Sequence, residues 1–122
     1  MEKYIDVIQR TLELASTCLE GIQHVELRLQ EGRYENTVVM LRDVLEGFYQ
    51  IEQTVKLLDN KLPANKLEAL ADKLSVLLDK TVTAYEKEEY IEALKIIQTK
   101  LLRDYDKWQK ELNKHLQPYV LS

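Results

Sequence analysis

The two histidines are the first residues of this 122-residue chain whose types could support chemistry. A di-metal centre in a helical bundle needs Glu-x-x-His pairs, which bring a carboxylate and an imidazole onto one inward face. Here the glutamate precedes the histidine by four positions, as Glu20 and His24 and again as Glu111 and His115. This spacing favours surface histidines, and we expect neither a metal site nor a cofactor.

His24 also raises the question of phosphotransfer. The residues after it include Leu27 and Arg28, faintly similar to the His-x-Leu-Lys-Gly motif of histidine-phosphotransfer domains. However, the leucine follows by three positions rather than two, and the small residue that leaves room for a phosphoryl group is absent. A phosphotransfer protein is therefore an alternative to the simpler interpretation, a solvated helix face.

A run of glutamates suggests a second enzymatic alternative. Glu86, Glu89 and Glu92 have the Glu-x-x-Glu spacing that holds magnesium in all-α nucleotide pyrophosphohydrolases. Those enzymes need a second acidic pair, of the form Glu-x-x-Asp, on a partner helix, and none follows downstream. A divergent metal-dependent hydrolase stays an alternative, while a charged helix start is the ordinary interpretation.

The remaining nucleophile candidate is the single cysteine. Cys18 lies on an apolar stripe between Ala15 and Ile22, where a thiol behaves as a small hydrophobic side chain. The chain has no Gly-rich phosphate loop, no Gly-x-Ser-x-Gly and no Cys-x-x-Cys. We therefore expect no catalytic residues and no enzyme.

The aromatic residues point instead to binding. The chain has seven tyrosines but one phenylalanine and one tryptophan, and Tyr and Trp anchor protein interfaces disproportionately. A mid-helix glycine can mark a close approach of another element, and the tail 118–122 is apolar enough to engage a partner or to fold back. The partner surface that we expect comprises Tyr49, Tyr105, Trp108, Tyr119 and Gly47, with boundary packing of the tyrosines as the alternative.

Helices must position these residues. Apolar residues recur at alternating spacings of three and four, predicting helices over about residues 3–31 and 34–59 and two more between residues 63 and 117. With three glycines and two prolines, the chain lacks the turn residues of an all-β fold. Gly32 suits a left-handed helix stop, and residues 59–63 form the clearest loop.

A weak internal repeat bears on the third and fourth helices. Six residues recur identically 56 positions later: Leu14, Ala15, Tyr34, Leu45, Tyr49 and Gln53, matched by Leu70, Ala71, Tyr90, Leu101, Tyr105 and Gln109. Similar helical patterning without duplication explains six identities equally well. The offset nevertheless maps Gly32 onto Glu88 and so favours a turn within residues 86–89.

The predicted fold is a single all-α domain, an antiparallel up-down-up-down four-helix bundle. It comprises hairpins over about residues 3–59 and 63–117 and a short tail at 118–122. Three helices, with a long continuous C-terminal one, are the alternative, because residues 84–90 contain neither glycine nor proline.

Composition limits the partners. The net charge is −4 and both signs are interleaved, so the chain lacks the basic face that nucleic-acid binding requires. The longest apolar run, residues 38–41, is far shorter than the ~20 residues that span a bilayer. The lone cysteine and the absence of a secretory signal at the N-terminus lead us to expect a cytoplasmic protein.

The sequence therefore favours a non-enzymatic interaction module, an adaptor or chaperone-like binder of another protein's helix or tail. In size and helical character the chain is loosely similar to bacterial export chaperones of the flagellar type, although no motif carries the likeness. Val7 with Leu14 and Val39 with Met40 extend beyond the core stripes, as in homodimers. A self-assembling structural protein is a further alternative.

Overall fold

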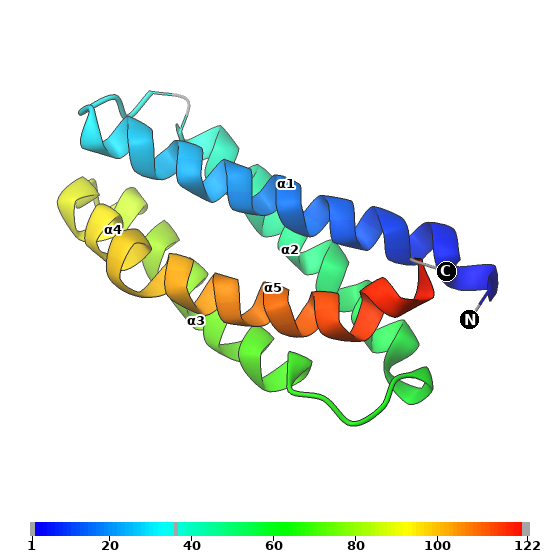
Figure 1. Cartoon of the computed structure of the whole chain (residues 1–122). Helices are drawn as coiled ribbons and strands as arrows, with labels where there is room; N and C mark the ends of the chain where they lie inside the picture. The colour runs from blue at the N-terminus through cyan, green and yellow to red at the C-terminus, as the bar shows by residue number, and fades with distance from the viewer. Residues whose placement is uncertain (1, 36, 121–122) are drawn as a thin grey trace.

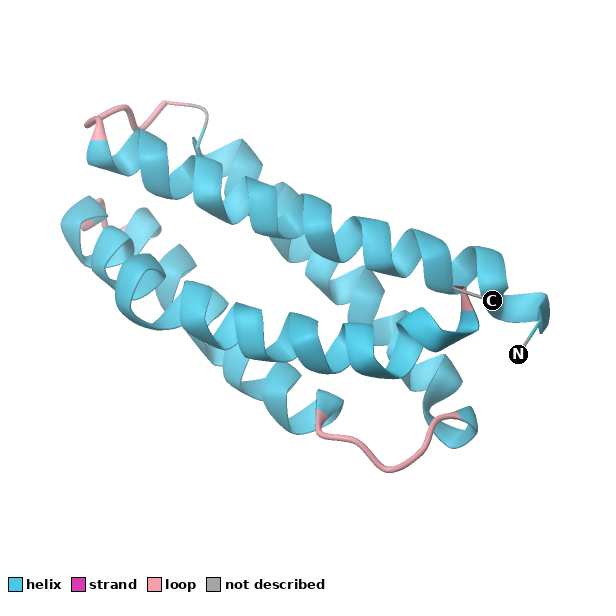
Figure 2. Ribbon diagram, in the orientation of Figure 1, coloured by secondary structure: helices cyan, strands magenta, loops and turns pink. Residues whose placement is uncertain are grey.

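Four antiparallel helical arms form the molecule in the computed structural model, which describes residues 2–35 and 37–120. The first three arms are α1 (Ile5–Gln30), α2 (Thr37–Leu58) and α3 (Leu67–Glu86). The fourth arm joins α4 (Tyr90–Ile96), the π-helical segment η3 (Ile97–Leu101) and α5 (Leu102–Leu116). Single 3₁₀ turns are η1 (Glu2–Tyr4), η2 (Asp59–Lys61) and η4 (Gln117–Tyr119). Figure 2 shows these helices joined by short loops, which confirms the all-α four-helix bundle.

The turn predicted within residues 86–89 is present, and it separates α3 from α4. Glu88 has a positive φ of 58°, as Gly32 has a φ of 71° after α1. The same pair of hydrogen bonds closes both helices. After α1, Arg33 N–H donates to the Arg28 carbonyl at 2.8 Å and Gly32 N–H to the Leu29 carbonyl at 3.1 Å. After α3, Glu89 N–H donates to the Ala84 carbonyl at 2.8 Å and Glu88 N–H to the Tyr85 carbonyl at 3.0 Å. This is the left-handed helix stop of the Schellman type. The alternative with three helices is therefore wrong.

Six of the seven buried positions of α1 recur in α3 at a constant distance of 56 residues. Each of these positions in α1 and its counterpart in α3 faces the common core. They are Thr11, Ala15, Cys18, Ile22, Val25 and Leu29 in α1, and Leu67, Ala71, Leu74, Leu78, Thr81 and Tyr85 in α3. The periodicity that predicted the helices therefore also describes which face each buries.

The second and fourth arms follow the same rule until the π-helical segment. Leu41 corresponds to Ile97 at a distance of 56 residues, but Phe48 corresponds to Tyr105 at a distance of 57. A π-bulge accommodates one extra residue in a helix, so η3 absorbs the difference. Tyr49 and Tyr105 are therefore identical residues 56 positions apart that do not occupy equivalent places in the fold. Tyr49 is 62% exposed and Tyr105 is fully buried.

Two mid-helix glycines bring α1 and α2 close together. A Cβ at Gly47 would lie 2.6 Å from the Cys18 sulfur, and one at Gly21 would lie 2.7 Å from Cγ2 of Val44. Both distances are too short for a side chain, so these positions belong to the packing between α1 and α2. Gly47 is buried there, and its predicted place in a partner surface was wrong.

Long-range hydrogen bonds hold α5 in place, one to the first hairpin and one within the second. The Tyr105 hydroxyl donates to the Ala15 carbonyl over 2.6 Å within the core. At the other end, Glu111 accepts from the backbone N–H of Lys66 over 2.8 Å, next to the start of α3. These bonds fix α5 between α1 and α3. Figure 1 shows α1 and α2 as one layer and α3 with α4 and α5 as the other.

The chain folds back after α5. The turn η4 lies against α1, and Tyr119 is half-buried against the core. The predicted tail therefore packs on the bundle as far as residue 120, and its last two residues lie outside the described part. Among the described helices, none combines the length and the apolar character needed to cross a membrane.

Candidate functional site

The predicted partner surface does not form one patch. Tyr105 is fully buried, so placing it on a surface was wrong, whereas Trp108, which is 1% exposed, lines a cavity from below rather than lying on the surface itself. The physical reason is the π-helical segment, which rotates the start of α5 so that both rings enter the core. Tyr119, the last residue of η4, is half-buried against the core. Of the five predicted residues, Tyr49 alone offers a largely exposed side chain, on α2.

The two histidines make local contacts on their own helices. Arg28 Nε lies 3.0 Å from Nε2 of His24, one turn away. His115 Nε2 lies 3.2 Å from the carboxylate of Glu111, which the Lys66 amide also contacts. The contact with Arg28 therefore occupies Nε2 of His24, one of the two ring nitrogens that could accept a phosphoryl group.

The other chemical candidates lie apart. Glu86 and Glu89 flank the exposed turn after α3, and Glu92 lies in the first turn of α4. Within residues 2–35 and 37–120, no three acidic, histidine or cysteine side chains are placed to hold one metal ion. Burial raises the pKa of the Cys18 thiol to about 11, which keeps it protonated at neutral pH.

The candidate site lies on the surface along the seam where α2 and α3 meet. These neighbouring helices touch at few points, in contrast to the closely packed α1 and α2. Cavities open at both ends of the seam. Along α2 they are lined by Arg42 and Leu45 at one end and by Glu52 and Lys56 at the other. Tyr49 lies between them at helical spacing, so one continuous stripe of α2 borders both; we call this feature the α2/α3 groove.

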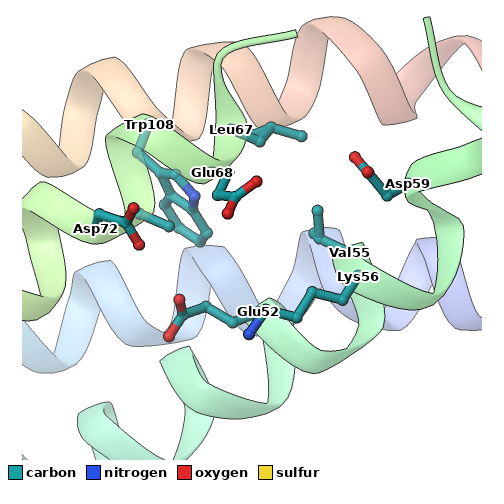
Figure 3. Close-up of a pocket in the computed structure, with 9 residues that line it drawn as sticks. Glu52, Val55, Lys56, Asp59, Leu67, Glu68, Asp72 and Trp108 are labelled. Atoms are coloured by element: carbon teal, nitrogen blue, oxygen red, sulfur yellow. The ribbon is translucent and has the colours of Figure 1, made fainter. Parts of the chain in front are cut away.

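The larger cavity of the groove measures about 310 Å³ and is shown in Figure 3. Its walls come from two helices and its floor from a third. The α2 wall comprises Glu52, Val55, Lys56 and Asp59 at the end of the helix, the α3 wall comprises Leu67, Glu68, Ala71 and Asp72, and Trp108 of α5 forms the floor. The cavity thus combines an apolar floor with a strongly acidic rim.

Acidic side chains dominate the lining of this cavity. Four carboxylates line it against one lysine, and among the described residues none of the four is in a salt bridge. Burial raises the pKa of Glu52, Lys56 opposes this shift, and the negative charge of Asp72 raises the pKa further. When the four carboxylates are ionised, the one lysine therefore does not balance their negative charge.

The floor contributes a hydrogen-bond donor as well as an apolar surface. Among the hydrogen bonds found within the described part of the chain, none involves the indole nitrogen of Trp108, the one tryptophan in the sequence. Tyr85 Oη is the sole described side-chain polar atom both fully buried and unpaired, so the indole N–H is reached from outside. In Figure 3 the nitrogen lies on the ring edge that faces Glu68.

The smaller cavity, of about 110 Å³, lies at the opposite end of the groove. It is lined by Val38, Leu41, Arg42, Leu45, Val82, Tyr85 and Glu86. Beside it, the Tyr34 and Tyr90 rings stack with their centroids 4.1 Å apart, and Tyr85 meets Tyr90 edge-on. Counting Glu86 and Arg42 with the larger cavity, the groove carries five acidic and two basic side chains, a net charge of −3 in a chain of −4.

The four apolar residues that the sequence suggested for a homodimer contact do not lie together in the fold. Val7 and Val39 are both exposed, whereas Leu14 and Met40 pack against the core. Because α1 and α2 are antiparallel, valines near the start of each helix lie at opposite ends of the hairpin. They do not form one continuous apolar patch.

Sequence reasoning missed the acidic residues of the groove. Glu52, Glu68 and Asp72 sit at ordinary solvent-facing positions beside apolar stripes, as many helix carboxylates do. Their proximity depends on how far apart α2 and α3 lie, which no pattern within one helix reports. The only local signal is the spacing of Glu52 and Lys56 along one edge of α2, continued by Asp59 at the start of η2.

The chain belongs to a protein family described as a domain of unknown function, DUF8042, which matches residues 6–111. The match includes most of the bundle and all but the last turns of α5. Neither a curated protein nor a solved structure matches the chain.

Proposed function

We propose that this protein is a non-enzymatic interaction module that receives a helical segment of another protein in the α2/α3 groove. The observation that carries the proposal is the open seam between α2 and α3, with cavities at both ends and the exposed Tyr49 ring between them. Peptide recognition by a groove commonly uses an amphipathic helix whose apolar face enters it.

Charge selects the kind of segment. The five acidic and two basic side chains of the groove repel an acidic helix and attract a basic one. A partner helix with leucine on one face and lysine on the other supplies both an apolar surface for the floor and cations for the rim. The expected ligand is thus a basic amphipathic segment of a different protein.

Two synthetic peptides without tryptophan test this function. One carries leucine on its apolar face and lysine on its polar face; the other replaces every lysine with glutamate. By isothermal titration calorimetry we expect the lysine peptide to bind at least about tenfold more tightly, and more weakly in high salt. No binding of either peptide, or equal binding of both, contradicts the proposed function.

A matched pair of variants locates the binding site on α2. Tyr49→Ala removes an aromatic contact in the groove and should weaken the lysine peptide by about fivefold, or roughly 1 kcal/mol. Leu57→Ala removes a side chain that is 76% exposed but lies outside both cavities, and it should leave affinity unchanged. Equal effects of the two variants would place the peptide elsewhere.

A further inference from the structure

The cavity over Trp108 has the chemistry to recognise a single organic cation rather than a metal ion. Its four carboxylates come from both walls, and within the described residues no three of them approach closely enough to share one ion. A cation on a flexible chain can instead enter between the walls. The volume of about 310 Å³ leaves room for such a side chain.

Carboxylates on the α2 wall and the α3 wall repel each other across the cavity. Burial raises the pKa of Glu52 on α2, the negative charge of Asp72 on α3 raises it further across the seam, and Lys56 partly compensates. In Figure 3 the Asp72 carboxylate lies to the left of the Trp108 indole and the Glu52 carboxylate lies below it. A further positive charge placed between them would relieve the repulsion and also lie close to the aromatic floor.

The floor of the cavity also needs a hydrogen-bond acceptor, which a simple cation does not supply. The Trp108 indole is 1% exposed, and its N–H, which finds no acceptor among the described residues, opens into the cavity. A buried donor of this kind needs an acceptor when a ligand displaces water. A peptide supplies both groups, because a basic side chain carries the cation and a neighbouring carbonyl accepts from the indole.

We propose that this cavity anchors one lysine or arginine of the bound segment, with its cation between Glu52 and Asp72 and a peptide carbonyl against the Trp108 N–H. The inference rests on the proposed function, since the groove brings the segment to the cavity. It makes the Trp108 end of the groove the specificity-determining end.

The position of Glu52 supports this anchor. Its carboxylate loses solvation in the free protein and faces a like charge, so ionised Glu52 weakens the fold at neutral pH. A side chain that costs stability in the free state is a common feature of binding sites. Glu52→Gln should therefore keep or raise the thermal stability of the free protein while it weakens binding.

The test uses the lysine peptide and neutralising variants. Glu52→Gln and Asp72→Asn should each weaken the peptide by about tenfold in calorimetry. Glu46→Gln and Asp43→Asn remove exposed carboxylates from α2 residues that line neither cavity, and they should bind like the unaltered protein. Binding should also shift the emission of the one tryptophan in the chain, because Trp108 forms the cavity floor.

The outcomes separate the two proposals. If the lysine peptide binds equally to all five proteins and leaves Trp108 emission unchanged, the anchor is wrong while the interaction module stands. If it binds to none, both fail. Should n-butylamine at peptide concentrations reproduce the emission shift, the cavity binds free amines, and its assignment to a protein segment is overturned.

Discussion

Glu88 illustrates how one residue can hold a conformation that its side chain disfavours. Its φ of 58° lies in the left-handed region, which costs a side-chain-bearing residue about 1–2 kcal/mol. Gly32 adopts the same conformation in the first hairpin without that cost. The hydrogen bonds that close α3 therefore compensate for strain at Glu88.

Glu88→Gly should consequently stabilise the protein. Relief of the left-handed strain exceeds the added flexibility of glycine in the unfolded chain, for a net gain of about 0.5–1 kcal/mol. Urea denaturation followed by circular dichroism measures the change. Lys87→Gly is the matched control, since its φ of −89° gains nothing from glycine, and it should not be stabilised. A loss of stability in Glu88→Gly would contradict the account.

At the scale of the element, η3 decides which face of α5 enters the core. If the same residues formed a regular α-helix without the widened turn, the arm would keep the 56-residue relation to α2, and Tyr105 would occupy the place equivalent to the exposed Tyr49. A π-bulge preserves the faces on either side of an insertion by widening one turn. The rings of Tyr105 and Trp108 are thus buried even though the 56-residue relation to α2 is interrupted at η3.

Deleting Thr99, an exposed residue inside η3, should be tolerated. The segment can become regular α-helix while α4 and α5 keep their apolar faces, so we expect stability within about 1–2 kcal/mol of the original. Deleting the exposed Lys107 instead rotates Trp108 and Leu112 by about 100° out of the core, at a cost of about 3 kcal/mol or more. Thermal unfolding compares the two deletions, and equal losses would refute the role assigned to η3.

At the scale of the whole molecule, the two hairpins complete one core. The hydroxyl of Tyr105 donates to the Ala15 carbonyl across them, and the side-chain amide of Gln109 donates to the Ser16 hydroxyl over 3.4 Å. Each hairpin alone would expose part of the buried faces of its helices, and most of the stability of a protein helix comes from packing of its apolar face. Folding should therefore require both halves.

Separate fragments test this cooperativity. We expect residues 1–62 and residues 63–122 to show little helix alone by circular dichroism at micromolar concentration. Mixed in equal amounts they should regain helix, because the break falls in the loop between α2 and α3. A monomeric 1–62 fragment with full helical content would contradict a shared core.

Local patterns were enough to predict much of the fold. The stripe through Ala15 and Ile22 predicted α1 and its buried face, and Gly32 predicted where that helix stops. The turn at Glu88 could be predicted only through its relation to Gly32, because glutamate carries no turn signal of its own. These features depend on backbone geometry and side-chain periodicity within a few residues, which the sequence records directly.

The tertiary structure decided what periodicity alone could not. It buried Tyr105 and Trp108 by means of one extra residue in η3, and it placed Gly47 against Cys18. It also brought Glu52 and Asp72 to opposite walls of one cavity. Each outcome depends on the distance and rotation between helices, which are set by how whole faces pack together. The sequence by itself determined the helices and their stops, whereas packing between helices determined the candidate site.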